Sequence, residues 1–325
     1  MCTALNYTNG HHYIGRNLDW DFDFPNDVVV TPRNYPFQWR NGKTCTSHNA
    51  LIGMAIIQND YPLYFEAAND KGLGMVGTAF AGFAKYFPKA EGKDNVATFE
   101  LIPYVLTQAS TLQEARALFD NMNIWDIPFS EQQPTSPMHW IVGSKEGSFV
   151  VESTKDGLKV YDNNWGVLTN APTFDWMSYN MANYVNLTRH EPTIQFAPDM
   201  KGIDLFSRGL GSSGLPGGVD SVSRFVRVAF TNLNSVCDPD PQKNVAQFFH
   251  ILSNVQQVRG EAEIKPGVFE ITQYACCIDT DTGIFYYSTY YNQSLTAVDM
   301  NKEDLEAKTL VSYPVLKEFQ FHAQN

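Results

Sequence analysis

The sequence predicts an α+β fold, a sandwich in which groups of strands are separated by groups of helices. Strand-like apolar runs cluster together, and segments with a helical apolar spacing follow them in groups of their own. No regular β-α-β alternation, internal repeat or charged linker is present. With 325 residues the chain is long enough to bury a full core, and we expect one domain spanning residues 1–325.

The first 80 residues are expected to form strands only, because their apolar runs are short and bounded by turn residues. These strands are residues 3–7, 13–18, 28–32, 51–57, 63–67 and 74–78. Helices are expected next. Residues 99–109 carry a helical apolar stripe, and Thr111 and Glu114 have the spacing of a capping box ahead of a helix that reaches residue 121.

The remaining chain follows the same grouping. Four strands and a helix are expected at residues 138–142, 148–152, 158–161, 167–169 and 177–186. Residues 187–219 have no regular pattern and hold a glycine-rich run, so we expect a long loop with a role in assembly or selectivity. Two helices and three closing strands are expected at residues 221–233, 245–255, 270–276, 285–290 and 296–299.

The composition limits the possible partners. A net charge of −12 and a pI near 5.0 argue against nucleic acid, which the surface would repel. No stretch approaches the apolar length of a membrane span, and the first 30 residues lack the pattern of a secretory signal. The five cysteines are an odd number without zinc spacing, which favours a reducing interior. We therefore expect a soluble, cytoplasmic protein that binds neither nucleic acid nor membrane.

Cys2 is the first candidate for chemistry. It follows the initiator methionine directly, and its small side chain suits removal of Met1 by an aminopeptidase. The product would carry a thiol and a free α-amine on one residue. An α-amine titrates near neutral pH and can therefore act as general base toward its own thiol. The alternative interpretation is that position 2 holds an arbitrary small residue.

Arg16 and Asp19 are the next candidates. Arg16 could favour the thiolate of Cys2, and Asp19 could hold its amine. Residues three apart on a strand point to opposite faces, so both would reach Cys2 only if the chain bends at or just after Asn17. A surface ion pair is the alternative interpretation.

Asn170 and Arg224 complete the candidate set. Asn170 ends an apolar strand, where its amide could donate to a developing oxyanion; a turn before Pro172 is the structural alternative. Arg224 lies in the first turn of an expected helix, which is unfavourable for the helix dipole and indicates a specific anionic partner.

Several motifs together resemble the choloylglycine hydrolase family, whose members are bile salt hydrolases and penicillin V acylases. They span nearly the whole chain in order. They are Met1-Cys-Thr-Ala4, Gly15-Arg-Asn-Leu-Asp19, Thr31-Pro-Arg-Asn-Tyr35, Tyr61-Pro-Leu-Tyr64, Lys71-Gly-Leu-Gly74, Leu168-Thr-Asn170, Gly214-Leu-Pro-Gly217, Ser223-Arg-Phe-Val226 and Phe249-His-Ile-Leu252.

The resemblance implies a four-layer αββα sandwich of the N-terminal nucleophile type, with mostly antiparallel sheets. It implies that Cys2 is catalytic, with Arg16, Asp19, Asn170 and Arg224 at the matching active-site positions. It further implies a cytoplasmic homotetramer in which residues 187–219 reach a neighbouring subunit. The expected activity is hydrolysis of the amide bond in glycine- or taurine-conjugated bile salts, through an acyl-thioester on Cys2.

Some positions bear on the substrate. Ala79 stands where the family more often has Asn or Tyr, and Ala171 where many bile salt hydrolases have Asn; a backbone N–H near Ala79 could still serve the oxyanion. Arg208 lies in a loop variant that the family associates with glycine conjugates. Phe24 and Phe80 belong to aromatic runs that the resemblance places near the apolar body of the substrate, although ordinary core packing is the alternative.

Other motifs are set aside. A glycine pattern at residues 72–77 formally matches a dinucleotide fingerprint, but no β-α-β unit surrounds it, so no cofactor is expected. The seven histidines show no paired ligand spacing, and we expect no metal.

Two rival functions stay open. The first keeps the chemistry but takes penicillin V or another N-acyl amide, such as an acyl-homoserine lactone, as Ala79 and Ala171 indicate. The second is a catalytically silent binding protein that retains the fold, in which Cys2 would be unprocessed or unreactive.

Overall fold

The computed structural model describes residues 1–325, and its first two strands form a hairpin. β1 (Cys2–Asn9) and β2 (His11–Trp20) pair in antiparallel fashion across Gly10, whose φ of 73° favours a residue without a side chain. Both strands are buried over most of their length because they lie inside a sheet that is covered on both faces.

The hairpin belongs to a six-stranded sheet in the order β14-β1-β2-β17-β18-β19, in which every pair is antiparallel. Strands from the end of the chain therefore pair directly with its beginning, since β17 adjoins β2. The other members are β14 (Val167–Leu168), β17 (Ile271–Asp279), β18 (Ile284–Thr289) and β19 (Thr296–Asp299).

A second, eight-stranded sheet faces the first and is also antiparallel throughout, in the order β13-β12-β11-β8-β7-β6-β3-β20. Its strands are β3 (Asp27–Thr31), β6 (Leu51–Gln58), β7 (Tyr61–Asn69), β8 (Gly74–Ala79), β11 (Met138–Ser144), β12 (Gly147–Thr154), β13 (Gly157–Asp162) and β20 (Val311–Pro314).

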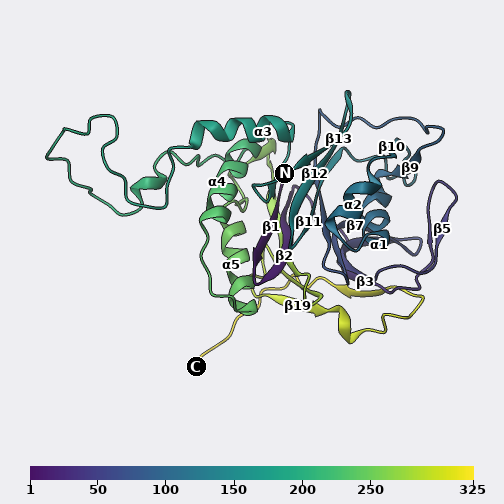
Figure 1. The fold of residues 1–325 in the computed structure, drawn as a ribbon. Coiled ribbons are helices and arrows are strands. Elements are labelled where there is room, and N and C mark those ends of the chain that lie inside the picture. Colours follow the sequence, from purple (N-terminus) through teal and green to yellow (C-terminus); the bar gives the residue numbers. More distant parts are fainter.

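Helices cover the two outer faces, which makes four layers (Figure 1). α4 (Ser221–Asn234) and α5 (Pro241–Ser253) pack on the six-stranded sheet, and α1 (Leu101–Gln108) and α2 (Leu112–Leu118) pack on the eight-stranded one. This arrangement confirms the predicted α+β sandwich with antiparallel sheets. None of the helices is both long enough and apolar enough to cross a bilayer.

The helix starts follow ordinary capping chemistry. Thr111 accepts a hydrogen bond from the backbone N–H of Glu114 (3.1 Å), which is one half of the predicted capping box, whereas the Glu114 carboxylate accepts from the N–H of Ser110 rather than from that of Thr111. The carboxylate of Asp220 accepts from the first turn of α4, and Asp240 does the same for α5, which begins with Pro241. The caps therefore place the start of each helix at a defined residue.

The shorter elements differ most from the prediction. The expected helix at 177–186 is α3 (Phe174–Asn180) followed by a 3-10 turn (Met181–Tyr184), and the expected helix at 99–109 begins with a 3-10 turn (Thr98–Glu100). Three small two-stranded sheets have no clear apolar alternation and were not predicted. Their strands are β4 (Phe37–Gln38), β5 (Thr44–Cys45), β9 (Asp94–Ala97), β10 (Met122–Trp125), β15 (Glu263–Lys265) and β16 (Val268–Phe269), of which β9 and β10 pair in parallel.

The two sheets approach closely at their interface. A side chain at Gly143 of β11 would overlap the Oδ1 atom of Asn6 in β1, and one at Gly74 of β8 would overlap Ile14 of β2. Glycine at these positions therefore lets polar and apolar side chains of one sheet reach the backbone of the other.

His12 is a buried polar residue at this interface. Its Nε2 donates to Asn6 Oδ1 (2.7 Å), and its Nδ1 accepts from the hydroxyl of Thr280 (2.7 Å). Burial lowers the pKa of His12 from its ordinary value to about 3. The ring therefore stays neutral in the folded protein at pH values where the unfolded chain binds a proton.

A pH dependence of stability follows. As the pH falls from about 6.5 towards 3, only the unfolded state gains a proton at this residue, so the free energy of unfolding is expected to drop by a few kcal/mol, at about 1.4 kcal/mol per pKa unit. In His12→Gln this contribution should vanish, so the free energy of unfolding should depend less on pH between about 6.5 and 3. Urea unfolding across this range checks it, with His322→Gln in the exposed C-terminal tail as the control. A variant slope equal to that of the wild type would contradict the assignment.

Residues 187–219 form a long arm that projects from the body beyond α3 and α4 (teal to green in Figure 1). Apart from a 3-10 turn at Leu210–Ser212 it has no regular structure, as predicted. Several of its large apolar side chains are exposed, and Phe196 and Phe206 are 88% and 89% exposed.

Candidate active site

Cys2 is the first residue of β1 and lies opposite Leu18 of β2. Directly opposed residues of an antiparallel pair share a face, and Leu18 lies on the same face of β2 as Ile14, which meets Gly74 of β8 in the other sheet. The thiol of Cys2 therefore faces the eight-stranded sheet. It is a free cysteine that is 3% exposed.

Arg16 lies on the same face, opposite Ala4 and so one position diagonal from Cys2. The guanidinium is fully buried, donates from Nη1 to the carbonyl of Gly77 (2.5 Å), and lies 3.6 Å from Glu66 Oε2. Burial opposes its charge, but Cys2, Tyr274 and Glu66 outweigh this effect and raise the pKa of Arg16 above its ordinary value. A fixed positive charge thus stands beside the thiol.

Asp19 occupies the opposite face of β2. The bend at or just after Asn17 that would bring both side chains to one face is not formed, because β2 runs without interruption from His11 to Trp20. The alternation of faces is kept: Asn17 donates to Leu252 of α5, and Asp19 Oδ1 accepts from the hydroxyl of Thr272 (2.6 Å). The alternation therefore places the charge of Arg16 on the face of β2 that carries the Cys2 thiol, and the charge of Asp19 on the opposite face.

The second carboxylate oxygen of Asp19 is buried without a hydrogen-bond partner. An unpartnered buried carboxylate oxygen costs free energy, which a nearby hydrogen-bond donor or cation would offset. Asp19 also acts electrostatically on the amine at the start of the chain. The unpartnered oxygen of Asp19 can therefore accept one further hydrogen bond.

Asn170 follows β14, the edge strand beside β1, and contacts the backbone of Cys2. Its Oδ1 accepts from the backbone N–H of Cys2 (2.9 Å), and its Nδ2 donates to the carbonyl of Ala79 (2.8 Å). The hydroxyl of Ser221 holds the Asn170 backbone N–H (2.9 Å). One Nδ2 hydrogen is therefore used for positioning, and the amide has a second one available.

Arg224 in the first turn of α4 connects these parts. It is fully buried; Nη1 donates to the carbonyl of Cys2 and to the hydroxyl of Thr3 (2.6 Å), while Nη2 donates to Asn170 Oδ1 (2.6 Å). Burial lowers the pKa of Arg224, although Asp19 and Cys2 act in the opposite direction. Arg224 thus orients Cys2 and Asn170 relative to each other.

Met1 occupies the space next to the Cys2 backbone nitrogen. Its terminal amine donates to the carbonyl of Asp19 (2.8 Å) and forms an ion pair with Glu270. Burial lowers the pKa of this amine. The start of the chain is therefore held in place by protein groups before any processing.

The predicted substrate-binding residues have mixed outcomes. Phe24 is half-buried in an aromatic cluster just beyond β2, with its ring 5.2 Å from Phe65 and 4.6 Å from Phe22. Phe80 is fully buried and stacks on His139 with ring centroids 4.1 Å apart, which agrees with the alternative of core packing. Arg208 is exposed in the projecting arm. It is not brought to Cys2 within one chain.

Four further residues support the site and were not predicted from the sequence: Thr272 holds Asp19, Ser221 holds Asn170, and Glu66 and Tyr274 lie next to Arg16. Only Glu66 carried a usable signal, since a carboxylate inside the otherwise apolar and small-residue segment of β7 is unusual. Ala79 contributes its carbonyl rather than its side chain.

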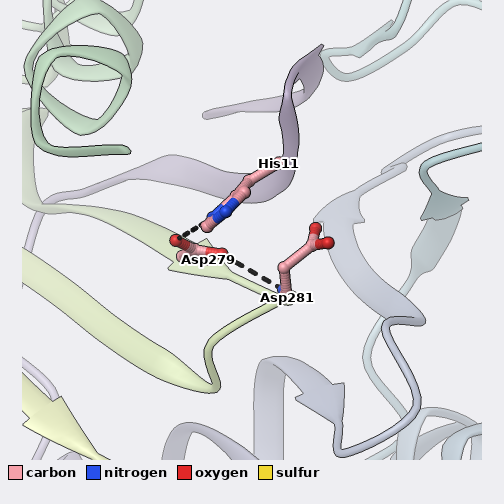
Figure 2. Close-up of side chains that lie close together, drawn as sticks. All are labelled: His11, Asp279 and Asp281. Carbon is pink, nitrogen blue, oxygen red and sulfur yellow. Dashed lines mark hydrogen bonds and ion pairs between the residues drawn. The ribbon is translucent and has the colours of Figure 1, made fainter. Parts of the chain in front are cut away.

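A cluster of possible metal ligands lies elsewhere, at the turn between β17 and β18 (Figure 2). Asp279 accepts from His11 Nδ1 (2.9 Å) through one oxygen and from the backbone N–H groups of Asp281 and Thr282 through the other. Asp281 accepts from the backbone N–H of His12 (2.7 Å). The carboxylates are thus already engaged in holding the turn.

Four layers with a buried cysteine at the start of a central strand form the architecture of N-terminal nucleophile hydrolases. The comparisons agree. The fold matches a crystal structure of a variant of conjugated bile acid hydrolase from Clostridium perfringens with a TM-score of 0.92 and 37% identity over 100% of both chains. Penicillin V acylase from Agrobacterium tumefaciens shares the fold, with a TM-score of 0.75 and 21% identity over 96% of this chain and 90% of that one.

The profile of the linear amide C-N hydrolases, choloylglycine hydrolase family, matches residues 2–313. The "Bile salt hydrolase/transferase" of Lactiplantibacillus plantarum is 44% identical over the whole length of both chains. The chain therefore belongs to the choloylglycine hydrolase family and is a hydrolase of linear amide C–N bonds, as the sequence motifs predicted.

Proposed function

We propose that this chain hydrolyses the amide bond of bile salts conjugated to glycine or taurine, with Cys2 as the nucleophile after removal of Met1. The observation that carries the proposal is the convergence of Arg16, Asp19, Asn170 and Arg224 on a cysteine at the head of β1. The substrate class is inferred from the full-length relative that is 44% identical, a bile salt hydrolase/transferase.

The chemistry needs no group beyond these residues. Loss of Met1 would free the Cys2 amine where its nitrogen is now 2.9 Å from Asn170 Oδ1. The thiolate, stabilised by Arg16, attacks the amide carbonyl. The C–N bond then breaks as the α-ammonium of Cys2 gives its proton to the leaving glycine or taurine. Water attacks the resulting acyl-thioester, with the amine as base, and releases the bile acid and the thiol.

In this mechanism Asp19 holds the ammonium form of Cys2 through its unpartnered oxygen. Arg224 orders Cys2 and Asn170 without touching the substrate. The second Nδ2 hydrogen of Asn170, together with a backbone N–H near Ala79, supplies the oxyanion hole.

Asn170→Asp tests this role, because it keeps the Oδ1 acceptor for Cys2 and Arg224 but removes the amide donor. We expect kcat to fall about 10²–10³-fold, the usual effect of losing one oxyanion donor. Steady-state kinetics on the best substrate measures it. Asn164→Asp, in the turn ahead of β14, is the matched control, and an unchanged kcat in Asn170→Asp would exclude the oxyanion role.

The substrate is tested by measuring amine release from glycocholate, taurocholate and penicillin V separately, on protein whose N-terminus has been checked by mass spectrometry. We expect both bile salts to be cleaved, with glycocholate preferred because of the loop variant that contains Arg208. A hundredfold preference for penicillin V would overturn the bile salt assignment. The rival assignment to penicillin V rests on Ala79, which offers the site no polar side chain. Hydrolysis of an acyl-homoserine lactone is tested in the same way.

The arm at 187–219 is part of the proposal, as the assembly and selectivity element of a cytoplasmic homotetramer. Its exposed apolar side chains favour contact with another protein surface over contact with water, and a second copy of the chain would cover them. Unpaired cysteines, including the buried Cys276 and Cys277, support a reducing compartment.

Charge placed on the arm is expected to break the assembly. Phe196→Asp with Phe206→Asp should shift the mass in sedimentation velocity from tetramer to smaller species, since two buried charges in an interface are strongly unfavourable. Phe319→Asp with Phe321→Asp, two exposed rings of the C-terminal tail, is the control. A wild-type protein that sediments as a monomer would contradict the tetramer.

A further inference from the structure

Glu66 is a fully buried carboxylate in the middle of β7, on the face that meets the six-stranded sheet. Its partners all come from that other sheet. The hydroxyl of Tyr274 lies 2.8 and 3.0 Å from its two oxygens, the thiol of Cys276 lies 3.5 Å from Oε1, and Arg16 Nη1 lies 3.6 Å from Oε2. A negative charge is thus held across the sheet interface, beside the arginine that faces Cys2.

Two acids share the charge of Arg16 at this interface, although the Cys2 thiolate also interacts with the charge of Arg224 from α4. Arg16 is acted on by the thiolate of Cys2 from β1 and by Glu66 from β7, and no other cation contacts Glu66. The strands that flank Glu66 in its own sheet place Met54 and Val76 next to it, so neither adds charge. Buried charges interact strongly, and whichever acid is ionised therefore draws on the same guanidinium.

We propose that Glu66 is a positioning residue that shares the charge of Arg16 with the Cys2 thiolate, and so sets how readily the nucleophile ionises. The Gly77 carbonyl and Glu66 hold the guanidinium of Arg16 in place, and the hydroxyl of Tyr274 in turn holds Glu66. This inference rests on the proposed role of Cys2 and adds a residue outside the set predicted from the sequence.

The titration of Glu66 agrees with this arrangement. Burial raises the pKa of Glu66 to about 7, against the opposing effects of Arg16 and of hydrogen bonds from Tyr274 and Cys276. Above about pH 7 Glu66 is ionised, and it then competes with the Cys2 thiolate for the positive charge of Arg16. Below about pH 7 Glu66 is neutral, and this competition is absent. Two acids coupled in this way titrate as a pair over a broad pH range.

The test is the pH dependence of iodoacetamide alkylation of Cys2, followed by mass spectrometry of the N-terminal peptide of the processed protein. In Glu66→Gln the competing negative charge is gone. We therefore expect the alkylation rate of Cys2 to rise with pH in a single, steeper step. The midpoint of this step should lie about one pH unit lower than in the wild type, which corresponds to about tenfold more thiolate at a given pH. Glu66→Asp withdraws the charge by one methylene and should give an intermediate midpoint. It carries the test if Glu66→Gln does not fold.

Glu100→Gln is the matched control, since Glu100 is also a buried glutamate but accepts backbone N–H groups of Ala97 and Arg40 in the α1 layer. It should leave the midpoint unchanged. A purely structural role of Glu66 would lower Tm without moving the alkylation curve, and that outcome, or an equal shift in the control, overturns the proposal. Alkylation needs no substrate, so failure to cleave bile salts would refute the proposed function and leave this test standing.

Discussion

Replacement of Cys2 by alanine is expected to reduce amide hydrolysis by at least about four orders of magnitude, because the proposed nucleophile is removed. The fold should survive. Alanine keeps the Cβ atom, and the backbone of residue 2 retains its bonds to Asn170 and Arg224. The measurement is amine release from glycocholate and taurocholate, with circular dichroism and Tm to verify folding.

Cys45→Ala is the matched control for this substitution, because Cys45 is a free, half-buried cysteine in β5, outside the cluster around Cys2. It should leave the rate unchanged. If Cys2→Ala retained a substantial fraction of wild-type activity, a different nucleophile would have to be sought. The acyl-thioester would then be excluded.

Retention of Met1 is expected to silence the enzyme as completely as loss of the thiol. With Met1 attached, the nitrogen of Cys2 is an amide that does not act as a base near neutral pH. The free α-amine then belongs to Met1, where Glu270 and the Asp19 carbonyl hold it. The precursor should nevertheless fold, since the residues around Cys2 are already in place in the chain that carries Met1.

The experiment is to express the protein while methionine removal is inhibited, to verify the N-terminus by mass spectrometry, and then to add a methionine aminopeptidase. We expect activity to appear in step with the processed form. The Cys2→Ala protein, treated identically, should remain inactive. A precursor that hydrolyses bile salts at the processed rate would show that the α-amine of Cys2 is not the base.

Much of the architecture could be predicted from local patterns. The alternation of apolar residues located the long strands, and the spacing of Thr111 and Glu114 located α2, because both signals act within a few residues of chain. The short strands β4, β5, β9, β10, β15 and β16 were missed for the same reason. Strands of two to four residues are stabilised by the partner they meet, which local pattern does not reveal.

The candidate site shows the same division. The position of Cys2 after Met1 and the motifs around Arg16, Asn170 and Arg224 were enough to name those residues. The order of β1 and β2 in the chain already made Arg16 a neighbour of Cys2. The sequence could not decide whether the chain bends at Asn17 to bring Arg16 and Asp19 to one face, and the structure shows no bend there. Asp19 instead stays on the opposite face of the unbroken β2, where the hydroxyl of Thr272 holds it.

By itself, then, the sequence determined the type of chemistry, the order of the elements and which face each strand residue presents. Only the tertiary structure decided what covers each face. It buried Phe80 against His139, carried Arg208 away on the arm, and set Glu66 of one sheet against Arg16 of the other. The physical reason is that a period of two specifies a side, whereas the partner across the sheet interface comes from a strand tens of residues away and depends on how whole sheets pack.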